Sequence, residues 1–197
     1  NVKNAGNKAR NDVEEIVKRE GYQSLVLSVD NWYEMGTLKA QLHKSKAIGQ
    51  ALNQLKQGDE LLIQFPMLHH SFFTTHHVKK AQKKGVKVNF IIHDLEALRY
   101  INVENFPLKH KIRIQIQESG LLGAADGIIA HNPIMKSVLV DKGIAADKIV
   151  SLGIFDYLIP NFQEKTGFTK NQPIIVAGNL AQEKAGYLYS LPAEPAY

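Results

Sequence analysis

The stretch VKVNFIIHDLEALR, residues 86–99, decides how the rest of the chain is interpreted. Its first seven residues are rich in Val, Ile and Phe, a composition typical of a strand buried within a sheet. The apolar run ends at His93 and Asp94, and helix formers follow. Because ligands bind outside the carboxyl ends of strands in open α/β sheets, this His-Asp pair is a candidate functional site. Asp94 is explained equally well as the cap of the next helix, since Asp accepts hydrogen bonds from the first N–H groups of a helix.

The composition is that of an ordinary soluble α/β chain of 197 residues, long enough for one or two domains. No apolar run approaches the ~20 residues of a membrane span, and no signal peptide is recognisable. The absence of cysteine excludes thiolate chemistry and suits a cytoplasmic protein. The net charge of +5 is too diffuse to indicate nucleic acid binding. It is compatible with phosphate-bearing ligands or with peripheral contact at an anionic membrane face.

Strand and helix patterns alternate along most of the chain. Apolar runs typical of strands occupy residues 24–29, 60–65, 86–93, 127–131, 148–152 and 173–177. Helical patterns occupy a stretch from residue 7 or 11 to Gly21, and residues 38–55, 71–84 and 133–142. This alternation predicts an α/β fold with a doubly wound, Rossmann-like parallel sheet.

Residues 108–117, LKHKIRIQIQ, carry a conflicting signal. Strict alternation of apolar and polar residues is a strand pattern. The continuation into ESGLLGAAD, and the need for a crossover before the strand at 127–131, favour a helix, which is the prediction adopted. A third interpretation is a basic amphipathic surface lying on a membrane, although a solvated face explains the lysines and the arginine more simply.

The C-terminal part of the chain indicates a domain boundary. Residues 155–170 are polar and rich in turn formers, as a linker is. An apolar strand pattern and a glycine-containing turn follow. We therefore expect one domain over residues 1–160, a linker over 161–171, and the first strand and helix of a second domain over 172–197.

Four segments together resemble a known family: IIHDLEALR (91–99), IIAHNPIM (128–135), LGIFDYL (152–158) and IIVAGNLAQEKAGYLY (174–189). Their content and order are similar to those of bacterial glycosyltransferases of the GT-B fold, in the galactofuranosyltransferase and glucosyltransferase group. Such enzymes have two doubly wound domains facing across a cleft. The resemblance implies that residues 1–160 bind the acceptor, and that the chain stops just inside the domain that binds the nucleotide sugar. We expect this chain alone not to transfer sugar.

The resemblance implies roles for residues at the first domain's cleft. Asp94 is the candidate catalytic base and His93 the residue that positions the acceptor or a phosphate, since either a carboxylate or an imidazole can accept a proton. Gly6 and Asn7 lie where the family has its first cleft loop, and a helix N-terminus behind such a loop favours phosphate or sugar oxygens. Arg99 is a further candidate for acceptor binding, although an exposed helical position is more often solvated.

Gly178, Asn179 and Lys184 form the candidate site for the donor diphosphate. A glycine turn leads there from a strand into a helix, and an ammonium group follows within reach. By the resemblance the nucleotide sugar, of the UDP-linked class, is a co-substrate, and no cofactor is expected. The acceptor is a cell-surface glycan or glycoprotein. The sequence leaves open the sugar, the stereochemistry and self-association into a homo-oligomer.

Two further groups of residues invite a functional interpretation. The pairs His69-His70 and His76-His77 lie seven residues apart, roughly 10 Å along a helix, which is too far for one metal ion without a third element. No native metal site is expected. Trp32 follows the strand pattern at 24–29 and could stack on a sugar ring, but core packing explains it better.

A second class of function fits the same fold. The chain could be a non-catalytic interaction or oligomerisation module that assists a partner transferase. The glycine turn followed by Lys184 favours the transferase over this alternative.

Overall fold

The computed structural model describes residues 5–27, 35–67, 69–99 and 107–153, together with residues 158, 159, 161, 182 and 186–190. The chain divides into two compact units, Asn1–Leu158 and Ile159–Tyr197. In the second unit the described residues include one short 3-10 helix, Gly186–Ser190. The strand pattern at 173–177 lies outside the described residues. The assignment of the two ends to acceptor and donor domains stays a prediction.

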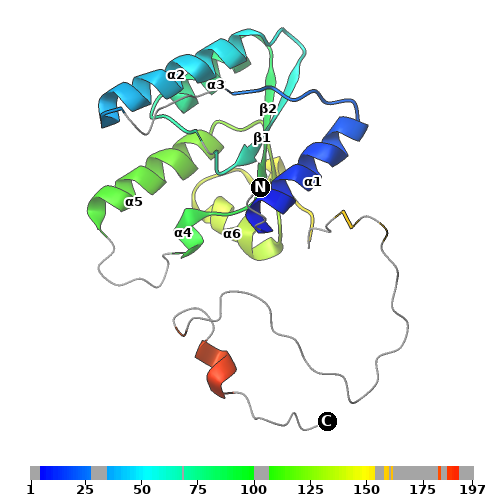
Figure 1. Cartoon of the computed structure of the whole chain (residues 1–197), viewed down its shortest axis with the longest axis vertical. Helices are drawn as coiled ribbons and strands as arrows, with labels where there is room; N and C mark the ends of the chain where they lie inside the picture. The colour runs from blue at the N-terminus through cyan, green and yellow to red at the C-terminus, as the bar shows by residue number, and fades with distance from the viewer. Residues whose placement is uncertain are drawn as a thin grey trace. The chain divides into compact units, whose positions relative to one another are not determined.

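The first unit is built on a four-stranded sheet in which neighbouring strands are parallel (Figure 1). The strands are β1 (Glu60–Phe65), β2 (Lys87–Ile92), β3 (Gly127–Ala130) and β4 (Ile149–Ser151). They lie side by side in chain order, β1-β2-β3-β4. Each strand was predicted from a short apolar run, and the alternation of strands with helices confirms the Rossmann-like α/β fold.

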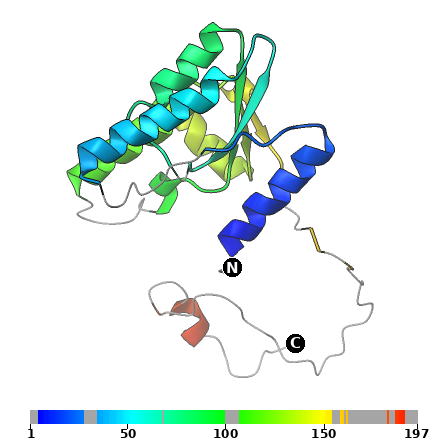
Figure 2. The ribbon, with the colours of Figure 1, turned by 45° about the horizontal axis from the view of Figure 1, so that its top comes forward.

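The helices are distributed over both faces of the sheet. They are α1 (Ala5–Arg19), α2 (Thr37–Asn53), α3 (Thr74–Lys83), α4 (Glu96–Arg99), α5 (Leu108–Ile114) and α6 (Pro133–Asp141). Figures 1 and 2 show α1 on the opposite side of the strands from α2 and α5. No helix among the described residues is long and apolar enough to cross a membrane.

The two faces of the sheet are buried to different degrees. Phe90, Ile92 and Ile128 point to one face and are fully buried in the main core, beneath apolar residues of α2, α3 and α6. On the other face, Ile129 is only partly buried and Val150 is 59% exposed. Side chains alternate between the two faces along a strand. The burial therefore shows that one face of the sheet is well covered, whereas the face that bears α1, here called the thinly covered face, is partly open.

Glycines follow two of the helices, and Gly21 does so as the sequence predicts. Gly21 follows α1 with a φ of 91°, and the N–H of Tyr22 donates to the carbonyl of Val17 at 3.0 Å. Gly85 follows α3 with a φ of 88°. Both are left-handed conformations in which a Cβ is unfavourable, so glycine stops the helix at low cost.

Two sequence predictions near the N-terminus are wrong. Residues 24–27, the described part of the predicted strand at 24–29, form no strand. Leu25 and Leu27 pack against the core while Val26 is 78% exposed, so burial alternates as it does in a strand. Among the described residues, however, no neighbouring strand forms a hydrogen-bonded ladder with this segment. Helix α1 begins at Ala5 rather than at residue 7 or 11, so Gly6 and Asn7 lie in its first turn and not in a preceding loop.

The ambiguous segment 108–117 is helical, as predicted. Helix α5 continues directly into a π-helix, Gln115–Gly120. Glu118 within it is 2% exposed, and its Oε2 lies 3.5 Å from Nζ of Lys142. Because the segment is helical, its alternating apolar residues do not share one face: Ile114 is buried and Ile112 is 52% exposed.

Candidate functional site

The candidate site lies at the carboxyl edge of the sheet, where β2 and β3 end. His93 follows β2, and its backbone N–H donates to the carbonyl of Phe65 at 2.8 Å, which extends the β1-β2 ladder by one hydrogen bond. His131 follows β3, and its ring meets that of His93 edge-on with centroids 6.3 Å apart. Two imidazoles from adjacent strands are therefore held together at the edge where open α/β sheets bind ligands.

Hydrogen bonds from the thinly covered face hold His93 in place. Its Nε2 lies 2.7 Å from Oε1 of Gln64 in β1. The Gln64 amide donates through Nε2 to the carbonyl of Arg10 at 3.2 Å, and Arg10 donates to the carbonyls of Gln64 and Pro66 at 3.4 and 2.6 Å. With the Gln64 amide oriented this way, His93 Nε2 is the donor and Nδ1 is the acceptor nitrogen of the ring.

The electrostatic surroundings keep His93 neutral. Burial is the largest effect, and the positive charge of Arg10 and the neighbouring His131 add to it; together they lower the pKa of His93 to about 4. Burial also lowers the pKa of Arg10 and of His131. At neutral pH the site thus presents an uncharged imidazole beside a guanidinium.

Asp94 brings a carboxylate to the same edge. Its negative charge raises the pKa of His131 and so opposes the effect of burial on that ring. Helix α4 begins at Glu96, and the residue just before it is Leu95, which is fully buried. Asp94 is two residues before the first residue of α4. Its interpretation as the cap of this helix stays a prediction.

The family model of the glucosyltransferase 3-like N-terminal domain matches residues 1–154. The chain belongs to this family. Beta-1,6-galactofuranosyltransferase WbbI of Escherichia coli (strain K12) is 28% identical to it over 193 residues, which is 95% of this chain. The chain spans about half of that relative's length, 51%. The resemblance to the glucosyltransferase and galactofuranosyltransferase group is thus confirmed.

In this glucosyltransferase 3-like domain, only part of the predicted site is brought together. His93 and Asp94 lie at the carboxyl edge as expected. Gly6 and Asn7 belong to the first turn of α1, and Arg99 is the last residue of α4. Their side chains lie outside what the structure describes, as do Gly178, Asn179 and Lys184. The roles of these six residues stay predictions.

Asn132 caps helix α6. Its Oδ1 accepts a hydrogen bond from the N–H of Met135 at 2.9 Å, and Pro133 occupies the first position of α6. This is a standard N-cap, since Asn is a favoured cap residue and proline needs no N–H partner at that point. The cap fixes the chain direction immediately after His131.

The two histidine pairs lie just before helix α3 and within it. His69 and His70 precede α3, whereas His76 and His77 lie within it. Nε2 of His77 lies 2.8 Å from the hydroxyl of Ser45 in α2. In the described parts of the chain, no group of three or more His, Asp or Glu residues is placed to hold a metal ion. Trp32 lies outside these parts.

Arg10, Gln64 and His131 are the site residues that sequence reasoning missed or set aside. Arg10 sits on an amphipathic helix and Gln64 interrupts an apolar strand, and neither pattern indicates a site. His131 follows a predicted strand as His93 does. Two histidines at the ends of consecutive strands of a parallel sheet were therefore the available signal, because such ends meet at one edge.

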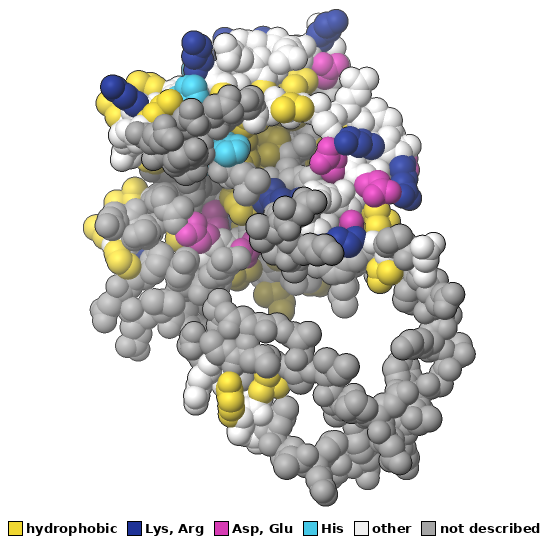
Figure 3. All heavy atoms as spheres, in the orientation of Figure 1, with side chains coloured by type: hydrophobic (Ala, Val, Ile, Leu, Met, Phe, Trp, Pro, Cys, Tyr) yellow, Lys and Arg dark blue, Asp and Glu magenta, His cyan; other side chains and the backbone are white. Residues whose placement is uncertain are grey.

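The surface charge adds little to the identification of a ligand. On the face drawn in Figure 3, the Lys and Arg side chains are spread among acidic ones and do not gather into one basic patch. On this face, the described side chains therefore form no broad basic patch.

Proposed function

We propose that this domain is the acceptor-binding half of a glycosyltransferase that uses a nucleotide sugar, UDP-linked, and glycosylates a cell-surface glycan or glycoprotein. The observation that carries the proposal is the group formed by His93, Asp94 and His131 at the carboxyl edge of the parallel sheet. Membership in the glucosyltransferase 3-like family and the similarity to a galactofuranosyltransferase support the same reaction class.

Asp94 is the proposed general base. In a transfer with inversion, the acceptor hydroxyl oxygen forms a bond to the anomeric carbon while the bond from that carbon to the nucleotide diphosphate breaks. The hydroxyl proton passes to the carboxylate, and the nucleotide diphosphate leaves with the bonding electrons. A transfer with retention needs no base at this point, so the anomeric configuration of the product tests this role.

His93 is the proposed positioning group. Gln64 holds the ring through Nε2 at the carboxyl edge of the sheet, where it could contact the acceptor or a phosphate. The lowered pKa of His93 keeps the ring uncharged there at neutral pH. Gly6, Asn7 and Arg99 are proposed to bind other parts of the acceptor.

The donor is proposed to meet the second unit. A glycine turn at Gly178 and Asn179 would receive the diphosphate through backbone N–H groups, with Lys184 supplying positive charge. Because the chain spans about half the length of its galactofuranosyltransferase relative, this stretch alone is proposed not to transfer sugar.

The decisive experiment uses the longer protein that includes a donor domain. Release of nucleotide diphosphate is measured for a panel of UDP-sugars, with and without glycan acceptors. Asp94→Asn is expected to lower kcat by roughly 10²–10⁴-fold, as loss of a general base does, with an unchanged circular dichroism spectrum. Asp147→Asn, at an exposed position of the short helix Ala146–Lys148, is the matched control. Near-normal transfer by Asp94→Asn would remove Asp94 from the mechanism.

The alternative function is a non-catalytic interaction module for a partner transferase. It predicts that the longer protein neither binds nor hydrolyses any UDP-sugar. Binding of a UDP-sugar by isothermal titration calorimetry, followed by turnover, discriminates the two.

Peripheral membrane contact is a second proposal, supported by α5. Leu108 and Ile112 are 71% and 52% exposed one turn apart, beside the exposed Lys111. Apolar side chains flanked by a cation are typical of an interfacial helix. Co-sedimentation with vesicles containing anionic lipid is expected for the chain and reduced for Leu108→Ser/Ile112→Ser. Equal sedimentation of the two proteins would argue against this surface.

A further inference from the structure

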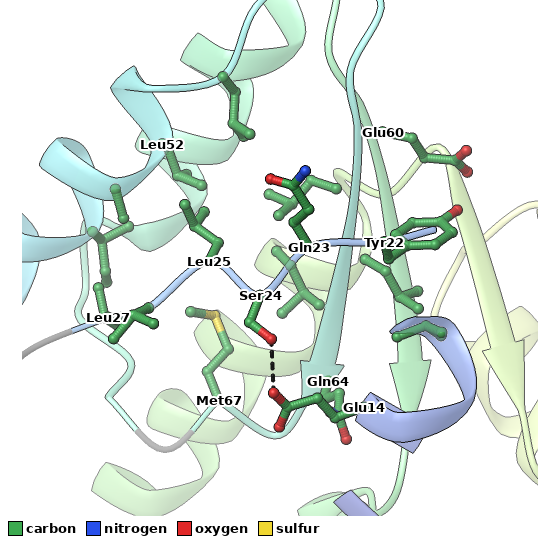
Figure 4. Close-up of a pocket in the computed structure, with 18 of the residues that line it drawn as sticks. Glu14, Tyr22, Gln23, Ser24, Leu25, Leu27, Leu52, Glu60, Gln64 and Met67 are labelled. Atoms are coloured by element: carbon green, nitrogen blue, oxygen red, sulfur yellow. Dashed lines mark hydrogen bonds between the residues drawn. The ribbon is translucent and has the colours of Figure 1, made fainter. Parts of the chain in front are cut away.

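Gln64 is a polar residue near the end of the largely apolar strand β1. It lines the cavity drawn in Figure 4, where it lies at the carboxyl end of β1 beside helix α1. It pairs with Ile91 of β2, two residues before His93. Because side chains alternate along a strand, Gln64 and His93 project from the same face of the sheet, the thinly covered face. An apolar side chain would suit the strand as well, so the amide needs another explanation.

Gln64 and Arg10 exchange hydrogen bonds between the sheet and α1. The Arg10 guanidinium donates to the carbonyls of Gln64 and Pro66, at 3.4 and 2.6 Å. In the other direction, the side-chain amide of Gln64 donates to the carbonyl of Arg10 at 3.2 Å. A carbonyl oxygen only accepts hydrogen bonds, so the nitrogen of the amide, and not its oxygen, faces Arg10. The backbone of α1 therefore decides which way the Gln64 amide points.

The orientation of this amide decides where His93 carries its proton. Oε1 of Gln64 lies 2.7 Å from Nε2 of His93. Since an amide oxygen only accepts, Nε2 is the protonated nitrogen. A glutamate in this place would have no donor for the Arg10 carbonyl, and its charge would favour the protonated imidazole. Among side chains of this length, the amide of glutamine is the one that meets both requirements.

Helix α1 is also held at a second place, independently of Gln64. Oδ2 of Asp12 accepts a hydrogen bond from the N–H of Leu158 at 3.0 Å, and Nζ of Lys8 donates to the Leu158 carbonyl at 2.6 Å. Asp12 and its neighbour Val13 are both 6% exposed. A change at Gln64 thus leaves α1 attached to the rest of the first unit. Variants of Gln64 can report on His93 rather than on the loss of the helix.

We propose that Gln64 is a positioning residue for the acceptor: held by the backbone of Arg10, it presents His93 in one orientation and with its proton on Nε2. This inference rests on the proposed function, in which His93 contacts the acceptor. Gln64 acts through the imidazole, as residues do that lock the side chains of a binding site by hydrogen bonds. Arg10 and His131 face the ring from α1 and from the end of β3, and Asp94 follows it in the chain. Gln64 adds an uncharged contact to these groups.

The first test is an NMR titration of the His93 ring in the full 197-residue chain. Gln64→Glu is expected to raise the pKa of His93 from about 4 to roughly 5–7, since an opposite charge in contact with an imidazole favours its charged form. Gln64→Leu is expected to abolish the preference for the proton on Nε2, which the ¹⁵N shifts of the two ring nitrogens report directly.

The matched control is Gln82→Leu. Gln82 is another partly buried glutamine, and its amide donates to the Ala124 carbonyl at 2.7 Å and to the Asp126 carboxylate at 3.0 Å. Its replacement removes comparable hydrogen bonds away from His93. It is expected to leave the titration and the ¹⁵N shifts of His93 unchanged.

The second test uses the longer protein that includes a donor domain. Gln64→Leu is expected to raise KM for the acceptor roughly three- to tenfold, the range that one hydrogen bond supplies, and to leave KM for the UDP-sugar within about twofold. Gln64→Glu is expected to move the acidic limb of the pH profile of kcat/KM to higher pH, because the uncharged ring is then lost at a higher pH. Gln82→Leu is expected to do neither.

Two results overturn the proposal. An unchanged titration of His93 in Gln64→Glu would mean that the two side chains are not in contact. An unchanged acceptor KM in Gln64→Leu would mean that the contact does not position the acceptor. A wild-type protein that turns over no UDP-sugar would instead refute the proposed function and the acceptor role with it, while the titration still decides whether Gln64 fixes the ring. If Gln64→Leu fails to fold, Gln64→Met, which matches glutamine in length, replaces it in both tests.

Discussion

Acidification is expected to destabilise this domain through His93, and the size of the effect follows from its burial. The folded state lowers the pKa of His93 to about 4, whereas an unfolded chain returns it to about 6.5. Between these values the unfolded state binds more protons than the folded state. The free energy of unfolding therefore falls as the pH drops below about 6.5 and levels off near pH 4.

The magnitude can be worked out from the two values. At pH 5 the unfolded His93 is almost fully protonated and the folded one is almost neutral, which costs about 2 kcal/mol of stability relative to neutral pH. The ring is only partly buried, and solvent screening reduces the expected loss to about 1 kcal/mol. For a chain of this length, 1 kcal/mol corresponds to roughly 2–4 °C in the unfolding midpoint.

The assay is urea unfolding of the wild-type chain and of His93→Gln at pH 7.5 and pH 5. Gln retains an N–H donor toward Gln64 but does not titrate. His93→Gln is expected to lose about 1 kcal/mol less than the wild type between the two pH values. His69 and His77, whose pKa burial also lowers, contribute to both proteins and cancel in the difference.

The control is Val140→Ala, a substitution at an exposed position of α6 that removes no titratable group and should change the free energy of unfolding equally at both pH values. If the free energy of unfolding of His93→Gln falls as steeply as that of the wild type, His93 is not held neutral by the fold. The electrostatic description of the site would then be wrong.

Three further changes test other parts of the structure. Arg10→Met should raise the pKa of His93, because the Arg10 charge helps to lower it; an unchanged titration of the ring by NMR would contradict this. Asn132→Ala removes the hydrogen bond to the Met135 N–H and should cost about 1 kcal/mol in urea unfolding, whereas Asn132→Asp, another good cap, should cost much less. Leu139→Ala opens a cavity at a fully buried position of α6 and should cost about 2–5 kcal/mol, whereas Val140→Ala, at a 38% exposed neighbour, should cost well under 1 kcal/mol.

The strands of the sheet could be predicted because their signals are local. ELLIQF at residues 60–65 and GIIA within 127–131 are apolar runs bounded by polar residues or glycine, and both are strands. The prediction for residues 24–29 rested on the same kind of run and is wrong for the described part. A strand exists only when a neighbour pairs with it, and composition does not report the neighbour.

The site was predictable only in part for a similar reason. His93 and Asp94 stand out because they follow an apolar strand directly. The contact between Gln64 and His93 depends on the register in which β1 and β2 pair, Gln64 lying beside Ile91. The hydrogen bonds from Arg10 to the carbonyls of Gln64 and Pro66 depend on where α1 packs against the sheet. Neither relation is written in the spacing of residues along the chain.

The strand order has a consequence for how the domain is made. Because β1, β2, β3 and β4 lie side by side in chain order, each strand pairs with the strand that precedes it. During synthesis, every new strand finds its template already outside the ribosome, and none has to be inserted between strands that are already paired. Assembly can thus proceed outward from β1 in the direction of translation, with His93 in place before His131 arrives to complete the pair.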